Sequence, residues 1–551
     1  MPDDFTLAPF NLGPDGLAWI EDRMAHLTGR QKIAQVFNVL LWGSDQAAVD
    51  MVRELQPGSV GRFDVVDAAN EKALIEDLNA SFVVPLVVTT DLEGSFATPK
   101  DATPSPNPMA FAAIDDPEVT EAVSAAMARQ AAPLGVRWSF TPAVDINKAW
   151  RSGIVGTRSF GSDPDHVQAQ ALAHMRGLQG AGCAATAKHW PGEGFDDRDQ
   201  HLVTTVNPLS VAEWEATFGK LYRAMIEEGV MAIMPAHIAF PAYMRDVEGV
   251  TGKDAYRPAS INRALNENLL RQKLGFRGIL VSDATPMAGL TSWMPRHELV
   301  VELLNAGCDV ILFAKDLRSD IETIEEALVD GRLSWERIDQ AVRRQLALKA
   351  SIGLHREGGK LASPSTDGAD HATISDALKR APTLVKDNGA QLPMTPERYR
   401  NVLLVSKGVV FPPAPRPLPL ALIDMMRGEG FEVTHHQWGT PVDPTGYDLL
   451  LYVFAEETLL TRGIVSLNWL EMNGQFEAAM NRHWHDVPVI MVSLGWPYYL
   501  AEATMVPTYI NAYAAHPAMQ RNVLDALMGK LPFLGKSPVD PWCGIDPEAF
   551  A

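Results

Sequence analysis

Short apolar segments alternate with amphipathic segments of helical length between roughly residues 10 and 350. PLVVTTD, CAATAKHW and GILVSDA are examples of the apolar segments, and EVTEAVSAAMARQAAPLG shows the helical spacing found between them. A chain that alternates strands and helices in this way pairs its strands in parallel, because each helix returns the chain to the same edge of the sheet. The pattern predicts an α/β fold, a (β/α)8-type, TIM-like barrel over residues 10–353, with about seven recognisable strands. GSVGRFDV is the weakest of them.

Polar residues stand at the carboxyl ends of several predicted strands. They are Asp91, Lys188, His189, His237 and Asp283. An unpaired charge is costly inside a core, so a buried strand that ends in one usually delivers it to a site. Barrels of this type build their sites at the carboxyl ends of the strands. We therefore expect these side chains to meet at the barrel mouth.

The stretch KHWPGEGFDDRDQH, from Lys188 to His201, carries a second candidate pair. Asp199 precedes His201 by two positions. In an extended segment such residues point to the same side, so Asp199 can orient His201 and stabilise its positive charge during proton transfer. On the residues alone, a solvated loop histidine beside an unrelated aspartate is the better interpretation.

A second domain follows a stretch without hydrophobic periodicity. HREGGKLASPSTDGADHA is rich in Gly, Ser, Pro and Asp, and it predicts a linker over residues 354–384. NVLLVSKG, YDLLLYVFA and DVPVIMVSL then form a new series of strand-like segments. They predict a smaller α/β sandwich domain over residues 385–545.

Charge and composition exclude several classes of partner. The formal net charge of −21 argues against nucleic acid and against anionic membrane surfaces. MPDDFTLAPF has no basic segment followed by an apolar run, and no apolar run of about 18 residues occurs. The chain has three cysteines, Cys183, Cys308 and Cys543. The first two lie in apolar runs, where a small buried side chain is a better interpretation than half of a disulfide. We expect a cytoplasmic protein without a cofactor or metal.

Several blocks of the chain together resemble glycoside hydrolase family 3. KHWPGEGFDDRDQH is similar to that family's KHFPGxG…D-x-H loop, which is typical of its β-N-acetylglucosaminidases, and GFRGILVSDATPMAG is similar to its nucleophile strand. DLEG, GTRSFGSDP and MPAHIAFP follow the same order as the family's blocks. The resemblance implies a retaining exo-β-N-acetylglucosaminidase that acts on a small glycoside or oligosaccharide, with Asp283 as nucleophile and Asp199-His201 as acid/base dyad. It further implies that Asp91, Arg158, Lys188 and His189 hold sugar hydroxyls. We place His237 at the same mouth and expect it to bind substrate as well.

The chain departs from the family pattern at two positions. Ser95 stands where a second glycine usually follows DxEG, and Glu193 stands where the loop usually has histidine. In the glucosidase branch a glutamate of the second domain often supplies the proton. Glu456, Glu457 and Glu471 are available for that role, but with Asp199-His201 present we expect them to be surface or helix residues.

Other functions remain open on the sequence. A close alternative is a glycoside phosphorylase, because a histidine donor places no fixed anion where phosphate would enter. A metal-dependent barrel amidohydrolase would use His189, His237 and Asp283 as ligands, but it requires a His-x-His on an early strand, which the chain lacks. A sugar-binding protein without activity is the last alternative. Asp145 is expected to be structural, bonded to the GTR loop, and Met234 to belong to the core.

Overall fold

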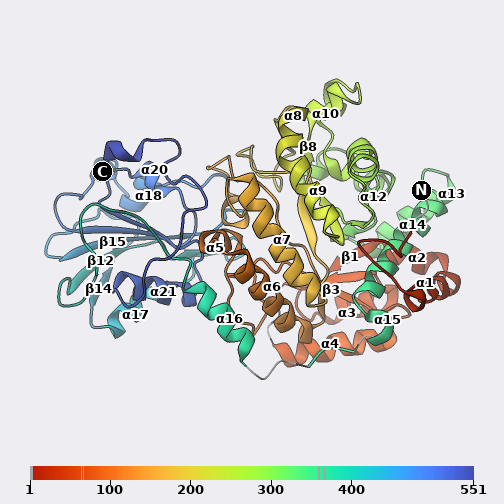
Figure 1. The fold of residues 1–551 in the computed structure, drawn as a ribbon, viewed down its shortest axis with the longest axis horizontal. Helices are drawn as coiled ribbons and strands as arrows, with labels where there is room; N and C mark the ends of the chain where they lie inside the picture. Colours follow the sequence, from red (N-terminus) through yellow and green to blue (C-terminus); the bar gives the residue numbers. More distant parts are fainter. Residues whose placement is uncertain (1–3, 64, 66, 358–359, 364–367, 551) are drawn as a thin grey trace.

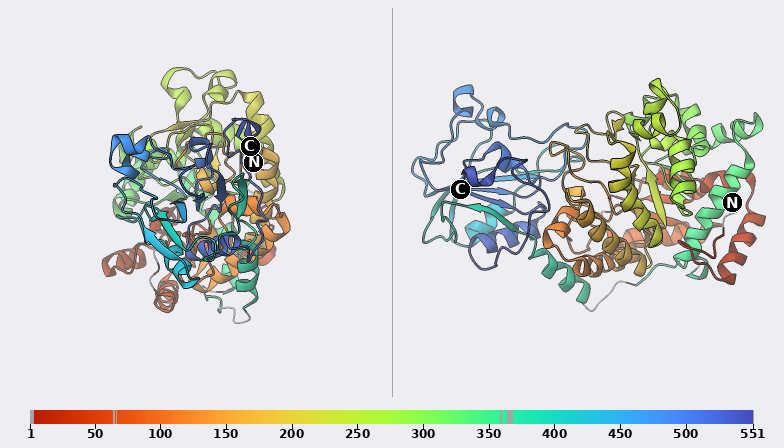
Figure 2. Two further views of the ribbon diagram at one scale, coloured as in Figure 1. Left: turned by 90° about the vertical axis from the view of Figure 1, so that its left-hand side faces the viewer. Right: turned by 45° about the horizontal axis from the view of Figure 1, so that its top comes forward.

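The structure, a computed structural model, describes residues 4–63, 65, 67–357, 360–363 and 368–550. Two domains lie side by side along the long axis of the molecule, and the N-terminus lies in the first domain, far from the C-terminus in the second (Figure 1). Figure 2 shows the same division from another side. No helix among the described residues is long and apolar enough to span a membrane.

Parallel strands of the first domain close into a ring. One run of neighbours has the order β10-β1-β2-β3-β4 and the other has the order β5-β7-β9. Parallel bridges Trp138–Ala184 and Val281–Val310 join the two runs at both ends. The eight strands that form this ring within the described residues are β1 (Phe37–Leu40), β2 (Ser59–Gly61), β3 (Val87–Thr90), β4 (Val136–Ser139), β5 (Thr186–Trp190), β7 (Ala232–Pro235), β9 (Ile279–Leu280) and β10 (Ile311–Leu312). The predicted barrel fold is thereby confirmed. β2 is the weak GSVGRFDV segment, of which Asp64 lies outside the described residues.

Helices follow the strands in the order that a βα repeat requires. The helices that follow the ring strands are α3 (Gln46–Leu55), α4 (Ala68–Ser81), α6 (Pro117–Ala131), α7 (Pro164–Gly180), α9 (Lys220–Glu227), the π-helix η6 (Ala264–Lys273), α12 (Arg296–Asn305), α13 (Leu317–Val329) and α14 (Trp335–Ser351). Helices α1 (Pro14–His26) and α2 (Gly29–Gln35) precede the first strand. Because each crossover returns the chain to the same edge, all strand carboxyl ends face one mouth.

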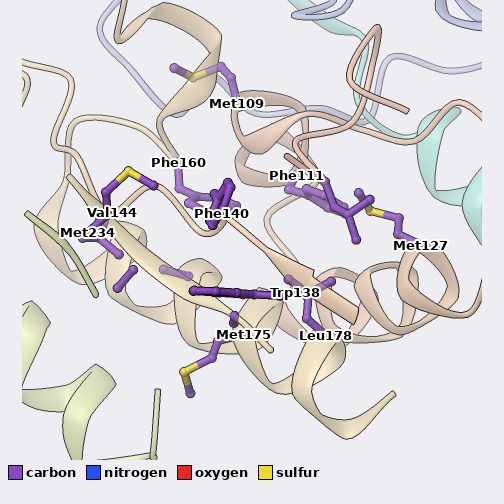
Figure 3. Close-up of a cluster of buried hydrophobic side chains, with 14 of the residues drawn as sticks. Met109, Phe111, Met127, Trp138, Phe140, Val144, Phe160, Met175, Leu178 and Met234 are labelled. Atoms are coloured by element: carbon purple, nitrogen blue, oxygen red, sulfur yellow. The ribbon is translucent and has the colours of Figure 1, made fainter. Parts of the chain in front are cut away.

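Large apolar side chains fill the space between β4 and its helices (Figure 3). Trp138 on β4 is 1% exposed, and its indole N–H donates to the Thr186 hydroxyl of β5 over 2.8 Å. Figure 3 shows Met175 and Leu178 of α7 beside this ring. Burial of such side chains stabilises a fold by about 25 cal/mol per Å² of apolar surface, so this layer holds the helices on the barrel wall.

An ion cluster reinforces the junction of β9 and β10, which backbone hydrogen bonds also join, among them Ser282 to Val310 at 2.9 Å and Asp309 to Leu280 at 2.7 Å. Asp309 is fully buried, and its carboxylate accepts from Arg271, Arg337 and Arg344 at 2.8 to 3.0 Å and from the Leu280 amide at 3.0 Å. Burial opposes ionisation of this carboxyl, but the three guanidinium groups outweigh it and lower its pKa. A buried charge satisfied on both oxygens thus adds to the backbone hydrogen bonds between the two strands.

The second domain is a seven-stranded sheet with helices on both sides (Figure 1). Its order is β11-β17-β16-β15-β12-β14, with β13 paired to β15, and β11 is antiparallel to β17 while the other pairs are parallel. Its strands are β11 (Thr383–Asp387), β12 (Asn401–Val405), β13 (Val409–Val410), β14 (Glu432–His435), β15 (Leu449–Glu456), β16 (Val489–Ser493) and β17 (Thr508–Asn511). Helices α17 (Leu422–Gly428) and α21 (Pro517–Leu527) lie on one side, and α18 (Trp469–Asn473) and α20 (Tyr499–Glu502) on the other.

The predicted linker contains helices. α15 (Leu354–Glu357) and α16 (Ala369–Leu378) fall within 354–384, and residues 358–359 and 364–367 of that range lie outside the described residues. α16 packs against α6, and Asp370 forms an ion pair of 2.6 Å with Arg129. The sequence has little periodicity here because a helix docked by few side chains needs only a short apolar stripe, such as Ile374 and Leu378.

Candidate active site

The residues predicted to form the site all come from loops or strand ends at the carboxyl edge of the barrel. Asp91 directly follows β3, Arg158 ends the turn η2 (Gly156–Arg158), Lys188 and His189 lie in β5, and Asp283 follows β9. Asp199 and His201 lie in the loop between β5 and β6 (Thr205–Val206), and His237 lies between β7 and β8 (Ile238–Ala239).

Asp283 presents one unpaired carboxylate oxygen. Its side chain is nearly buried, and Oδ1 accepts the Ala284 amide at 2.7 Å. Oδ2 is buried and has no hydrogen-bond donor among the described residues. Burial opposes ionisation, but the imidazoles of His237 and His189 and the Ala284 amide outweigh it, so the pKa of Asp283 is lowered. The residue is therefore an ionised carboxylate with one oxygen available for bond formation.

His201 and Asp199 form a hydrogen-bonded dyad. Nδ1 of His201 lies 2.7 Å from Oδ1 of Asp199, which also accepts the His201 amide at 2.8 Å. Oδ2 of Asp199 accepts the amide of Thr461, a residue of the second domain, at 2.8 Å. Burial would raise the pKa of Asp199, but the hydrogen bonds and charge of His201 and the Thr461 amide lower it. The ionised carboxylate thus orients the ring and leaves Nε2 to exchange a proton.

The dyad loop is fastened to the loop that carries the nucleophile. The amide of Ala288 donates to the carbonyl of His201 at 2.9 Å, and the Thr204 hydroxyl donates to the Gly289 carbonyl at 2.6 Å. Gly289 itself packs so closely on the carbonyl of Gln200 that a Cβ there would lie 2.4 Å from that oxygen. These contacts hold the proposed proton donor and nucleophile in one unit.

A four-residue ion network lies at the carboxyl ends of β3 and β5. The Lys188 ammonium contacts Asp91 at 2.8 Å and Glu93 at 2.6 Å, and Arg158 donates twice to Glu93 at 2.9 and 3.0 Å. Burial opposes ionisation of Glu93, but Arg158 and Lys188 outweigh it and lower its pKa. Burial raises the pKa of Asp91, against the opposing effect of Lys188. The network fixes charged groups that can bind hydroxyls by strong hydrogen bonds.

Glu93 is a site residue that reasoning from the sequence did not single out. It lies within the DLEG block, two residues after Asp91, and it bridges Lys188 and Arg158. A buried cation at a strand end and a second one in a neighbouring loop require an anion between them, so Lys188 and Arg158 themselves were the available signal.

A second buried cluster adjoins the ion network, because His189 follows Lys188 in β5. It contains Asp145, His189 and Glu193. Oδ2 of Asp145 lies 2.7 Å from Nδ1 of His189, and Oδ1 accepts the amides of His189 and Glu193, both at 3.1 Å. Asp145 is therefore structural, as expected, but its side chain holds the β5 loop instead of the GTR loop. Within the described part of the chain, its backbone carbonyl alone bonds that loop, accepting from the Ser159 hydroxyl at 2.8 Å.

Glu193 takes the place of the expected histidine within this cluster. Its carboxyl accepts the Gln200 side-chain amide at 3.0 Å and the Thr205 hydroxyl at 3.3 Å. Burial, reinforced by the charge of Asp145, raises its pKa well above the ordinary value, in spite of Arg158. One candidate set of metal-ligand atoms occurs among the described residues, and it is these three side chains, within 4.8 Å of one another. Their direct hydrogen bonds account for the arrangement.

The raised pKa predicts how Glu193→Gln changes stability. In the folded protein Glu193 keeps its proton at pH values where the unfolded chain has lost it, so its contribution to stability falls as pH rises above the ordinary carboxyl range. Glutamine mimics the protonated form and carries no such penalty. We expect the variant's melting temperature to exceed that of the wild type at neutral and alkaline pH, with the difference vanishing in acid. Glu227→Gln, at an exposed position of α9, is the control and should leave the melting temperature nearly unchanged. A difference that grew in acid would contradict the assignment.

His237 differs from the expectation that it holds substrate. Nδ1 lies 2.9 Å from the Ser260 hydroxyl and Nε2 lies 3.0 Å from the carbonyl of Ala284, while its amide donates to Gln200. Burial lowers the pKa of this imidazole, despite the charge of Asp283. With both nitrogens engaged, the ring supports the Asp283–Ala284 backbone. Met234 is buried, as expected of a core residue.

The glutamates of the second domain have three different environments. Glu471 is exposed on α18, as expected. Glu456 bonds the Tyr499 hydroxyl. Glu457 is neither a surface nor a helix residue: Oε1 accepts the Ser95 hydroxyl at 2.5 Å and the Ala515 amide at 2.7 Å, and Oε2 accepts the Asn107 side-chain amide at 3.0 Å. Burial raises its pKa to about 7, against these hydrogen bonds. Ser95 thus replaces the usual glycine with a donor across the domain boundary.

Known proteins are similar to this chain in both sequence and architecture. Residues 28–348 match the model of the glycosyl hydrolase family 3 N terminal domain. A β-N-acetylglucosaminidase/β-glucosidase of Cellulomonas fimi is 38% identical, over 98% of this chain and 99% of that protein. A β-hexosaminidase of Methylobacillus flagellatus is 29% identical over 50% of this chain and 76% of its own length.

Solved structures of other proteins resemble this chain across both of its domains. The β-glucoside phosphorylase BglX bound to 2FGlc superposes with a TM-score of 0.87 at 30% identity, covering 98% of this chain and 99% of that one. A β-N-acetylglucosaminidase of Paenibacillus sp. str. FPU-7 has the same fold, with a TM-score of 0.81 at 24% identity over 94% of this chain and all of that chain. The match of the barrel and the full-length relative together show that this protein belongs to glycoside hydrolase family 3.

Proposed function

We propose that the protein is a retaining exo-β-N-acetylglucosaminidase that also accepts β-glucosides. The observation that carries this proposal is the pairing of an ionised, buried Asp283 that has one free oxygen with the hydrogen-bonded Asp199-His201 dyad on a fastened loop. The full-length relative from Cellulomonas fimi, whose name gives both activities, supports the choice of sugars.

The first half of the reaction forms a covalent intermediate. Oδ2 of Asp283 attacks the anomeric carbon, and the glycosidic C–O bond breaks as a glycosyl ester forms. Nε2–H of His201 gives its proton to the departing oxygen, and the Asp199 carboxylate holds the ring through Nδ1–H. The ion network of Asp91, Glu93, Arg158 and Lys188 binds the sugar hydroxyls during this step.

The second half returns the enzyme to its starting state. Water attacks the same anomeric carbon from the face the leaving group has vacated, and His201 accepts the proton of that water. The ester bond to Asp283 breaks, and the sugar leaves with the β configuration retained. Two inversions at one carbon require a nucleophile and a proton-transfer group on opposite sides of the sugar, and these are the roles that we propose for Asp283 and His201.

An assay with chromogenic glycosides tests the proposal. We expect release of 4-nitrophenol from the β-N-acetylglucosaminide and, to a lesser extent, from the β-glucoside, with the β-anomer as the first-formed sugar in a proton NMR time course. The α-glycosides of the same sugars are the matched controls and should stay intact. Inactivity on both β-glycosides, or an α-anomer as first product, would rule out the proposed reaction.

Phosphorolysis at the same site is a second candidate function. The β-glucoside phosphorylase superposes over nearly the whole chain. A histidine donor supports it, because a neutral imidazole repels an entering phosphate less than a carboxylate would. The same assay run with and without inorganic phosphate distinguishes the two acceptors: sugar-1-phosphate in place of free sugar identifies phosphorolysis, and free sugar alone in the presence of phosphate identifies hydrolysis.

A further inference from the structure

The second domain contributes a short segment to the barrel mouth. This segment, residues 457–465, follows β15 and contacts three separate barrel loops. The Glu457 carboxylate bonds Ser95 and Asn107. Its carbonyl accepts the Thr157 hydroxyl at 3.2 Å, next to Arg158. The segment thus reaches the loops that follow β3 and β4 before it reaches the dyad.

The end of the segment bonds the dyad itself. The Thr461 amide donates to Oδ2 of Asp199 at 2.8 Å, on the oxygen opposite the one that holds His201. The Thr461 side chain is exposed, so its contact with the dyad is through the backbone. Its φ is 62°, in the left-handed region that a β-branched residue rarely adopts. Strain of this kind persists only where surrounding contacts determine the conformation, and it gathers at functional sites.

Those surrounding contacts are present on both sides of Thr461. The Leu459 amide donates to the carbonyl of Gly153 at 2.7 Å, and the Arg462 amide turns back to the carbonyl of Leu459 at 2.9 Å. Gly153 approaches the segment so closely that a Cβ there would lie 2.2 Å from the Gly463 carbonyl. The segment is therefore pressed against the barrel loop 151–158.

We propose that the segment 457–465 makes the second domain part of the proton-transfer apparatus, with Thr461 as a positioning residue whose amide fixes the Asp199 carboxylate. A carboxylate held on both oxygens keeps the His201 ring in one orientation, so that Nε2 faces the glycosidic oxygen. Glu457 anchors the segment to the barrel. The inference rests on the proposed glycosidase function, and it assigns the second domain a role within that reaction.

The proposal predicts a defect that depends on the leaving group. The leaving group of a 2,4-dinitrophenyl glycoside, 2,4-dinitrophenolate, departs without being protonated. The phenolate of a phenyl glycoside of the same sugar is a much stronger base and needs a proton from His201. Damage to the contacts with the sugar slows both substrates equally, because the sugar is the same. Displacement of the dyad slows the phenyl glycoside selectively. The ratio of the two kcat/KM values therefore separates proton transfer from general damage.

Gly153→Ala is the test variant, since its methyl group would push the segment away without altering a group that contacts substrate. We expect kcat/KM for the phenyl glycoside to fall about 10- to 100-fold, with little change for the 2,4-dinitrophenyl glycoside. Glu457→Ala, which removes the anchor, should show the same pattern and decides the matter if Gly153→Ala does not fold. Gly428→Ala, on α17 where an added Cβ meets nothing within 4 Å, is the control.

Thr461→Gly tests which part of the residue acts. It keeps the amide and suits the positive φ, so the ratio should stay at the wild-type value. An equal loss on both substrates in Gly153→Ala and Glu457→Ala, or no loss in folded variants, would overturn the proposal, as would a selective loss in Thr461→Gly. The wild-type rates are measured first on the same sugars, so failure of the proposed activity is distinguished from failure of this inference.

Discussion

Asp283→Ala is expected to reduce kcat by at least about 10⁴-fold, because the nucleophile of a covalent mechanism has no substitute. The variant should still fold, with a melting temperature somewhat below that of the wild type at neutral pH, because the surrounding groups lower the pKa of Asp283 and so favour its ionised form in the folded state. Steady-state kinetics with 4-nitrophenyl glycosides and a thermal melt measure the two effects. Asp197→Ala, at an exposed position of the dyad loop, is the matched control.

The product formed with azide identifies the missing group. In Asp283→Ala, azide can enter the space that the carboxylate leaves and attack the anomeric carbon directly, so a β-glycoside with an activated leaving group yields the α-glycosyl azide by a single inversion. Near-normal turnover in the variant, or a β-glycosyl azide as product, would show that another residue is the nucleophile.

His201→Ala is expected to produce the second-largest loss, and its size should depend on the leaving group. Loss of a general acid/base lowers rates about 10²- to 10⁴-fold, so kcat/KM for phenyl glycosides should fall within this range. For 2,4-dinitrophenyl glycosides the first step should be nearly unaffected, and the glycosyl-enzyme should accumulate because no base activates water. Mass spectrometry of the intact protein would detect the added sugar.

Azide also tests the His201 assignment, with the opposite stereochemical outcome. It attacks the accumulated glycosyl-enzyme without a base, so turnover should rise with azide concentration and the product should be the β-glycosyl azide. Asp199→Asn, which keeps the shape of the partner but not its charge, should lose less than His201→Ala. Equal losses with both leaving groups would point to a structural role for His201.

Local sequence was enough to predict the fold class and the mouth of the barrel. Strand–helix alternation is set by hydrophobic periodicity within about 20 residues, and a polar residue at a strand end is read directly from its neighbours. Asp283, Lys188 and His189 could therefore be placed at one edge of the barrel from the sequence alone. The linker prediction was incomplete because it used the same local signal: α16 is held by its packing against α6, a contact that periodicity cannot reveal.

The structure adds the pairings between distant residues. Glu93 bridges Lys188 and Arg158, and both ring nitrogens of His237 contact protein groups, one of them the carbonyl beside Asp283. Glu457 was expected on the surface or in a helix, yet it crosses the domain boundary to Ser95. Each of these contacts joins residues far apart in sequence, so its energy depends on a geometry that only the assembled barrel and second domain create.

The sequence by itself determined which chemical groups this protein can use, namely a strand-end aspartate, an Asp-x-His pair and a set of strand-end charges. Only the tertiary structure decided which of them are satisfied by one another and which remain available. A carboxylate becomes a nucleophile when its surroundings leave one oxygen unpaired, as at Asp283, and it becomes a support when both oxygens are held, as at Asp145 and Asp199. That difference depends on burial and on partners brought together by folding, so it is decided by the tertiary structure.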